Sequence, residues 1–204
     1  MEDKDSFLLW ETKSTKEVFK TAIFSIEEKE RKGPNGQSGT FVVVNASQWV
    51  NVVVPLTLIE GKTPYFDDFL MVKQYRHGSS SITLEFPAGV IEKGEAPLMA
   101  AKRELKEESG YISDEFHYLG AINPNPAIMG NRTHTFVATN ALKHCALNLD
   151  PLEALCPMIV KRSFIENEIK KGDTGLMNNA IMVMVWHLFI CWENDFLKKD
   201  DLIF

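Results

Sequence analysis

The segment from Pro97 to Gly110 constrains the fold of this chain more than any other. Leu98, Ala101 and Leu105 recur at three- and four-residue spacing, which predicts one apolar helix face. Proline suits the first turn of a helix, and glycine suits the position just past its end. The sequence therefore predicts an amphipathic helix that starts at the proline and stops before the glycine.

Three glutamates share one side of this helix. Glu104, Glu107 and Glu108 are spaced i, i+3 and i+4, so their carboxylates face the same space. Like charges at this spacing cost roughly 0.2–0.5 kcal/mol of helix stability per pair, and crowded carboxylates resist ionisation unless a cation joins them. Mg²⁺ would resolve the conflict, because it prefers oxygen ligands. Taken alone, the helix is more typical of a solvated surface on which Arg103 pairs with Glu107.

The flanking residues favour the metal site. The stretch from Gly89 to Tyr111 resembles the Nudix box, G-x5-E-x7-R-E-U-x-E-E-x-G-U, where U is a bulky apolar or aromatic residue, and every specified position agrees. The resemblance implies an α/β fold, the family's α/β/α sandwich around a mixed β-sheet. It also implies a hydrolase of phosphoanhydride bonds that uses Mg²⁺, with Mn²⁺ as an alternative, to neutralise phosphate oxygens and ready a water for attack.

The same resemblance implies individual roles. Glu104 and Glu108 would be the principal metal ligands, with the carbonyl oxygen of Ala88 as a further ligand. Glu107 would be a ligand or the proton acceptor. Arg103 would orient the glutamates.

Three other positions of the box would shape its backbone. Glu95 would brace the loop before the helix. Gly89 and Gly110 would allow the tight loop and the exit from the helix.

Residues on either side of the box resemble the branch of the family that hydrolyses ADP-ribose and nucleoside diphosphate sugars. Ahead of the box stand Gln74-Tyr75-Arg76 and Leu84-Glu85-Phe86-Pro87, and Pro126 follows in a loop beyond it. Arg76 is either a bidentate clamp for a substrate phosphate or a surface arginine. Pro126 would shape the substrate pocket in this branch, with a plain turn proline as the alternative.

Two further candidate site residues come from outside these motifs. Glu153 is the nearest candidate for the second acid that completes the site in this branch, although Asp150 competes with it and a surface loop acid is the alternative. Trp49 is a candidate to stack on adenine, with a core tryptophan as the alternative.

Outside the box, the sequence predicts mostly strands, followed by helices near the end of the chain. Residues 18–24 and 40–44 flank Gly33-Pro34-Asn35-Gly36 and predict a hairpin. Further strands are predicted over residues 49–58, 69–74, 118–122 and 133–139.

Two more helices are predicted near the end of the chain. Ser163 and Glu166 form a capping-box pattern for a short helix that stops at Gly172. The apolar run over residues 180–192 is shorter than the roughly 20 residues that a membrane span needs, which predicts a buried helix.

Length and composition favour a single domain. The chain has 204 residues, of which 45% are hydrophobic and 25% charged, as in ordinary globular proteins. Within it, residues 1–60 are expected to be a mostly β segment and residues 61–204 the hydrolase domain. The resemblance implies a homodimer formed through the N-terminal strands, with twofold symmetry.

Charge and cysteine usage narrow the expected partners. A net charge of −6 argues against a nucleic-acid surface, so a small nucleotide is the expected partner. The three cysteines lack a C-x-x-C spacing, and the charged first residues do not form a signal peptide. These features predict a cytoplasmic protein with no membrane partner.

The sequence thus predicts a Mg²⁺-dependent hydrolase that cleaves ADP-ribose or a related nucleoside diphosphate sugar into a nucleoside monophosphate and a sugar phosphate. One alternative is a Nudix pyrophosphatase of nucleoside triphosphates or other sugar nucleotides. A second is a non-catalytic, nucleotide-sensing Nudix domain. Such sensing domains often lose glutamates of the box, and this chain has all of them.

Overall fold

The computed structural model describes residues 5–61 and 64–199. The chain divides into two compact units, of which unit 1 is Met1–Gln48 with Asn123–Arg132, and unit 2 is Trp49–Ile122 with Thr133–Phe204. From the sequence, we expected a mostly β segment over residues 1–60 and a hydrolase domain over residues 61–204. This division into domains stays a prediction.

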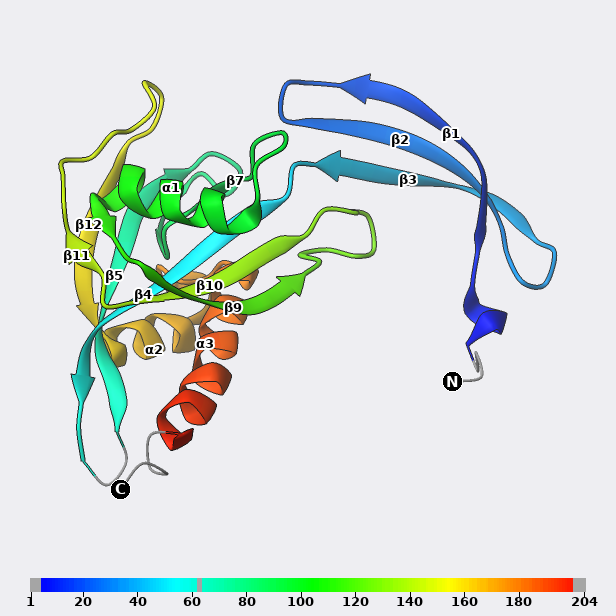
Figure 1. Ribbon diagram of the computed structural model, residues 1–204. Coiled ribbons are helices and arrows are strands. Elements are labelled where there is room, and N and C mark those ends of the chain that lie inside the picture. Colours follow the sequence, from blue (N-terminus) through cyan, green and yellow to red (C-terminus); the bar gives the residue numbers. More distant parts are fainter. Residues whose placement is uncertain (1–4, 62–63, 200–204) are drawn as a thin grey trace. The chain divides into compact units, whose positions relative to one another are not determined.

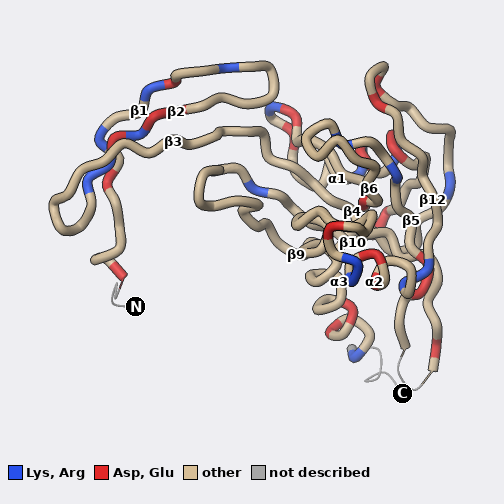
Figure 2. Tube along the Cα trace, turned by 180° about the vertical axis from the view of Figure 1, so that it is seen from behind, with Lys and Arg blue, Asp and Glu red and all other residues tan. Residues whose placement is uncertain are grey.

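Unit 1 contains the expected N-terminal antiparallel segment. Its three strands are paired in the order β1-β2-β3 and follow a short 3-10 helix. The elements are η1 (Ser6–Leu8), β1 (Glu11–Lys20), β2 (Phe24–Lys32) and β3 (Ser38–Ala46). Figure 2 shows how densely Lys, Arg, Asp and Glu occupy β1 and β2. Every residue of β1 is exposed, so this sheet has little apolar material of its own to bury.

The hairpin in unit 1 is confirmed, but one of its strands was misplaced. The turn closes where the Gly33 amide donates to the Gln37 carbonyl oxygen at 2.8 Å. Residues 18–24 do not form one strand, because the Thr21 hydroxyl accepts the amides of Ile23 and Phe24 and the chain turns there. The strand that enters the hairpin is β2. Its Glu and Lys residues have low strand propensity, which hides it from a pattern search.

Unit 2 is built on the predicted mixed sheet, which has seven strands. The central order is β12-β5-β4-β10-β9, and β4 and β10 are parallel while their other neighbours are antiparallel. Its strands are β4 (Trp49–Ile59), β5 (Tyr65–Arg76), β6 (Ser81–Glu85), β7 (Ala88–Val90), β9 (Glu115–Ile122), β10 (Thr133–Thr139) and β12 (Leu155–Lys161). A separate small pair is formed by β8 (Tyr111–Ile112) and β11 (Leu142–Lys143).

The sheet forks in its middle. One half of β4 pairs with β5, but its first residues, from Trp49 to Asn51, pair with β7. The last residues of β5, up to Arg76, pair with β6 instead. The short strands β6 and β7, which lead directly into the Nudix box, therefore lie between two diverging long strands.

Helices cover both faces of this sheet, which confirms the predicted α/β/α sandwich. Helix α1 (Pro97–Ser109) lies on one face, and α2 (Arg162–Lys170) and α3 (Ala180–Lys199) lie on the other, with a 3-10 turn η2 (Gly172–Thr174) between the last two (Figure 1). Successive residues of β4 alternate between two buried clusters, as the pleat of a strand requires. The α1 side includes Val50, Val52, Leu70, Leu105 and Phe136. The α3 side includes Val53, Phe69, Val137, Trp186 and Phe189.

The helix predictions differ in quality. Helix α1 has the predicted bounds, with Pro97 in its first turn and Gly110 in the left-handed conformation at φ 70°. The capping box predicted for α2 is wrong: the helix starts at Arg162, without a side-chain cap. Its start is fixed from a distance, because the Arg162 guanidinium pairs with the buried Glu193 carboxylate of α3 at 2.8 Å. Glu166 pairs with the same arginine, at 3.2 Å.

Helix α3 is longer than predicted. It runs for 20 residues and by length and composition alone could cross a membrane. Its buried side chains, among them Met182, Val185 and Phe189, pack into the core cluster on one face of the sheet. Such one-sided packing is typical of the core helix of a globular domain.

Candidate active site

The glutamates of α1 have different environments. Glu104 and Glu108 are buried, with 8% and 4% of their surface exposed, whereas the side chain of Glu107 is one-third exposed. The Glu108 carboxylate accepts the backbone amide of Ala88 at 2.9 Å, which joins the helix to β7. Because Leu105 of the same helix is fully buried in the core, the sheet itself fixes how the two buried carboxylates are presented.

Arg103 connects the box to its own loop. Its Nε and Nη2 atoms donate to the two oxygens of Glu95, both at 3.0 Å, and Nη2 also reaches the Val90 carbonyl oxygen at 2.9 Å. Its Nη1 atom donates to Glu104 at 2.8 Å and to Glu107 at 3.2 Å. One planar guanidinium therefore holds the loop and two glutamates in a fixed relation, which a flexible lysine could not do.

Burial leaves the inner carboxylates short of positive charge. Desolvation, helped by the charges of Glu104 and Glu153 and opposed by the Ala88 amide, raises the pKa of Glu108 to about 8. Desolvation also raises the pKa of Glu104, against the opposing effect of Arg103. By contrast, the paired Arg103 lowers the pKa of Glu95. The lack of compensating positive charge is therefore greatest at the two most buried carboxylates of the box, those of Glu104 and Glu108.

Two glycines of the box are needed for space. A Cβ at Gly89 would overlap the Glu104 carboxylate, so glycine is what lets that carboxylate lie against β7. A Cβ at Gly110 would overlap the Cys145 carbonyl oxygen, and the positive φ there also favours glycine. The first contact joins two parts of the box, and the second brings the segment around Cys145 onto its end.

The donor set fits a divalent cation that is completed by other ligands. Within residues 5–61 and 64–199, no group of three or more Asp, Glu, His or Cys side chains is arranged to hold a metal ion. Glu104 and Glu108 supply two buried, charge-deficient carboxylates, and one or two carboxylates plus substrate phosphates is the usual Mg²⁺ set. The residues present therefore fit a hard cation, with Ala88 beside them as the expected backbone ligand.

A cavity of about 350 Å³ in unit 2 brings together Trp49, Arg76 and Ala88, three of the candidate site residues. Arg76 forms a bidentate pair with the fully buried Glu85, through Nε at 2.8 Å and Nη2 at 2.5 Å. This pairing raises the pKa of Arg76. Two of its nitrogens are thus used within the protein, and a phosphate would meet Arg76 through Nη1.

Glu153 lies in an exposed loop within electrostatic reach of the buried pair. Its charge raises the pKa of both Glu104 and Glu108. The chain that leads to it is held on the end of α1, because the Asn148 amide donates to the Glu107 carbonyl oxygen at 3.0 Å. The loop is closed by its own turn, in which the Asp150 amide donates to the Glu153 carboxylate at 3.2 Å.

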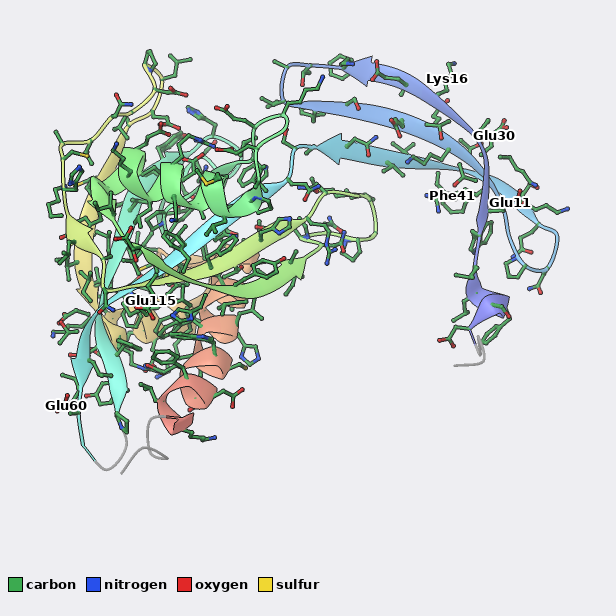
Figure 3. All side chains as sticks on the ribbon, in the orientation of Figure 1. Glu11, Lys16, Glu30, Phe41, Glu60 and Glu115 are labelled. Atoms are coloured by element: carbon green, nitrogen blue, oxygen red, sulfur yellow. The ribbon has the colours of Figure 1, made fainter. Side chains whose placement is uncertain are left out.

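Pro126 belongs to unit 1 and does not line the cavity of unit 2. It lines a separate cavity of about 740 Å³, together with Trp10, Arg31 and Phe41. The Trp10 and Phe41 rings meet edge to face, with centroids 5.2 Å apart. Figure 3 labels Phe41 on β3 beside the charged strands of this unit. The structure thus places the predicted substrate-binding residues in two different units.

The sequence analysis missed several residues of the unit 2 cavity. Asn51, Glu85 and Asn179 line it, and none of them had been assigned a role. A signal existed for two of them: Asn51 interrupts a run of valines, and Glu85 stands between Leu84 and Phe86. A polar residue inside an apolar strand usually has a buried partner or a ligand.

Comparisons with known proteins agree with this geometry. The model of the NUDIX domain family matches residues 47–153, more than half of the 204 residues. The methanol dehydrogenase activator of Bacillus methanolicus is 30% identical over 132 residues, which cover 65% of this chain and 67% of that protein. The ADP-ribose pyrophosphatase of Bacillus subtilis is 30% identical over 127 residues, covering 62% of this chain and 64% of the relative.

A solved structure supports the fold independently. The crystal structure of an ADP compounds hydrolase superimposes with a TM-score of 0.73 over 91% of this chain and 95% of that chain, at 21% sequence identity. That likeness shows the α/β/α fold. The match of the family model over more than half of the chain, which agrees with the glutamates gathered around Arg103, shows that the chain belongs to the Nudix hydrolase family, with relatives in its ADP-ribose pyrophosphatase-like branch.

Proposed function

We propose that this protein hydrolyses the diphosphate of ADP-ribose, or of a related nucleoside diphosphate sugar, with the help of Mg²⁺. The products would be a nucleoside monophosphate and a sugar phosphate. The relatives named above include an ADP-ribose pyrophosphatase, which supports this substrate class. Mn²⁺, another hard cation with a preference for oxygen, is expected to substitute.

The observation that carries this proposal is the buried carboxylate pair of α1. Two acidic side chains are buried against β7, at Ala88 and Gly89, and burial raises the pKa of both. Buried carboxylates with raised pKa values are concentrated at sites that bind a cation or a proton. Mg²⁺ would supply positive charge to the phosphate oxygens and activate a water molecule.

The chain's own groups would then divide the remaining work. Glu104, Glu108 and the Ala88 carbonyl oxygen would hold the ion, and Arg103 would keep Glu104 and Glu107 in place. Arg103 engages Oε2 of Glu107, so Oε1 is the atom that would accept a proton from the attacking water.

Two other residues would complete the arrangement. Glu153 would be a second proton acceptor, brought in by its loop. Arg76 would hold a substrate phosphate through Nη1.

The first test is a substrate panel with and without metal. With Mg²⁺ the protein is expected to convert ADP-ribose to AMP and ribose 5-phosphate, as measured by chromatography. Excess EDTA is expected to lower the rate by at least about 100-fold, because the two glutamates alone would repel the diphosphate. Added Mg²⁺ should restore it, and Mn²⁺ should do so at least in part.

The same panel separates the alternatives. Cleavage of a nucleoside triphosphate without cleavage of ADP-ribose would move the protein to a triphosphate pyrophosphatase. Saturable binding of ADP-ribose in calorimetry, without any AMP produced in Mg²⁺ or Mn²⁺, would indicate a sensing domain. Either result would contradict the proposed activity.

We also propose that the protein is a homodimer formed through unit 1. Both buried apolar clusters of the described chain lie in unit 2. Unit 1 exposes large apolar side chains on its strands and its N-terminal turn, including Phe7, Leu8, Leu9, Phe19 and Val42. A second copy would cover them. Light scattering is expected to give about twice the chain mass of 23.1 kDa, and a monomer at micromolar concentration would refute the proposal.

A further inference from the structure

A stripe of buried polar side chains crosses the sheet of unit 2 on the face covered by α3. Asn51 of β4 and Thr133 and Thr135 of β10 are each at most 1% exposed. Asn51 and Thr135 are directly paired in the parallel register, so their side chains point to the same face. The Asn51 amide nitrogen donates to the Thr133 hydroxyl at 2.6 Å. The residues that follow on the same face, Val53 and Val137, are apolar core.

Part of this stripe has no protein partner. The Oδ1 atom of Asn51 and the Oγ1 atom of Thr135 are buried without a hydrogen-bond partner in the part of the chain that the structure describes. A buried polar atom without a partner destabilises the fold, and native proteins keep few of them. Such exceptions to the apolar pattern are expected where a ligand or an ordered water completes the bonding.

Asn51 lines the cavity of unit 2, which is next to the buried glutamates. Ala88 lines the same cavity, and its amide is bonded to the Glu108 carboxylate. The volume of about 350 Å³ is within the range of small-molecule sites. A group attached to the diphosphate could therefore occupy it while the diphosphate lies at the carboxylates.

The lining of this cavity favours an uncharged, hydroxyl-rich group. Its two charged side chains, Arg76 and Glu85, neutralise one another in a bidentate pair. Its other polar lining residues are neutral amides and hydroxyls: Asn51, Ser79, Thr83, Asn178 and Asn179. The Asn179 side chain already caps the first turn of α3, because its Oδ1 accepts the Ile181 amide at 2.9 Å. A terminal phosphate would find there only Arg76, whose charge is already matched by Glu85, whereas sugar hydroxyls both donate and accept.

We propose that this cavity binds the sugar of the nucleoside diphosphate sugar, and that Asn51 determines specificity by accepting a sugar hydroxyl at its unpartnered Oδ1. The proposal rests on the proposed function and adds where the sugar lies. It assigns Asn178, at the exposed rim, a second contact with the same group. The protein would then prefer sugar nucleotides to triphosphates, because the cavity binds hydroxyl groups more favourably than a charged phosphate.

The test compares two substrates that share a diphosphate. ADP-ribose and the methyl ester of ADP both release AMP, but only the first carries a sugar on the outer phosphate. The measured quantity is the ratio of their kcat/KM values. In the unaltered protein this ratio is expected to favour ADP-ribose by at least about tenfold, because a site built to bond hydroxyls rejects a compound that lacks them.

Asn51→Ala is expected to lower this ratio by about tenfold, since the loss of the Asn51 amide affects only a substrate whose sugar hydroxyls would bind to it. Asn167→Ala is the matched control, because Asn167 is exposed on α2 and does not line the cavity. In Asn167→Ala, the ratio of the two kcat/KM values should stay within about twofold of the ratio in the unaltered protein. An equal loss for both substrates in Asn51→Ala would overturn the proposal and leave Asn51 a structural residue.

A second variant covers the case in which Asn51→Ala does not fold. Asn178 is exposed, so Asn178→Ala should fold normally, and its ratio is expected to fall at least about threefold. An unchanged ratio would exclude the sugar from this cavity. A different result would refute the proposed function itself, namely a protein that cleaves neither compound. A protein that cleaves both with equal kcat/KM retains that function and refutes only the sugar site.

Discussion

Glu108→Gln is expected to lower kcat by about two to three orders of magnitude while the protein stays folded. The amide is isosteric with the carboxylate, and its oxygen can still accept the Ala88 amide that now bonds to Glu108 at 2.9 Å. What is lost is the negative charge that would bind the cation. Half-maximal activity should therefore also require a higher Mg²⁺ concentration.

The thermal midpoint separates this effect from misfolding. Burial disfavours the charged form of Glu108 and raises its pKa, so above neutral pH the neutral amide should not lower the Tm of the metal-free protein. Glu60→Gln is the matched control, because Glu60 is exposed near the end of β4, far from α1 (Figure 3). It should leave kcat unchanged. If Glu108→Gln kept an activity near that of the unaltered protein, Glu108 could not be a ligand of the catalytic metal ion.

Local signals account for what the sequence predicted correctly. Helix α1 has its predicted bounds because its start signal, Pro97, and its stop signal, Gly110, lie at the two ends of the segment itself. Strand β10 also has its predicted bounds of residues 133–139. Its β-branched and aromatic residues are strand formers, and most of it is buried. The arrangement around Arg103 follows from the spacing of the box, which fixes what a helix can present to the preceding loop.

Long-range contacts account for what it missed. Helix α2 starts at Arg162 because that arginine is held by Glu193, a residue 31 positions away. The capping-box pattern at Ser163 could not reveal this. Strand β12 contains Pro157 and is largely exposed, so neither propensity nor alternation marks it. It exists because it pairs with β5 along the edge of the sheet.

The site shows the same division between local and distant information. The glutamates of the box could be read from their spacing, whereas Asn51 gains its place through Thr133, which lies 82 residues later. Arg76 was recognised as a candidate, but its bidentate partner Glu85 was not. That partner decides how much of the arginine remains for a phosphate, and only the pairing of β5 with β6 brings the two together.

Gly89→Ala is expected to lower kcat/KM for ADP-ribose by about 100-fold, because a displacement on the order of 1 Å at a reacting group costs this much. The new methyl group would overlap the Glu104 carboxylate, which must then move away from β7 and from Arg103 Nη1, now 2.8 Å away. Gly89 is not among the residues with positive φ, so alanine suits its backbone. The overlap is with the far end of a flexible side chain, so the protein should still fold.

Gly39→Ala provides the comparison for this prediction. It places the same methyl group in a strand, where the nearest atom, on the Phe41 ring, is at an ordinary contact distance of 3.5 Å. Both variants are expected to have nearly the same circular dichroism spectrum, but only Gly89→Ala should lose activity and require more Mg²⁺. Since the proposed mechanism uses the Glu104 carboxylate in its present position, full activity in Gly89→Ala would show that the ion is held without it. The metal site would then have to be assigned to Glu108 and other groups.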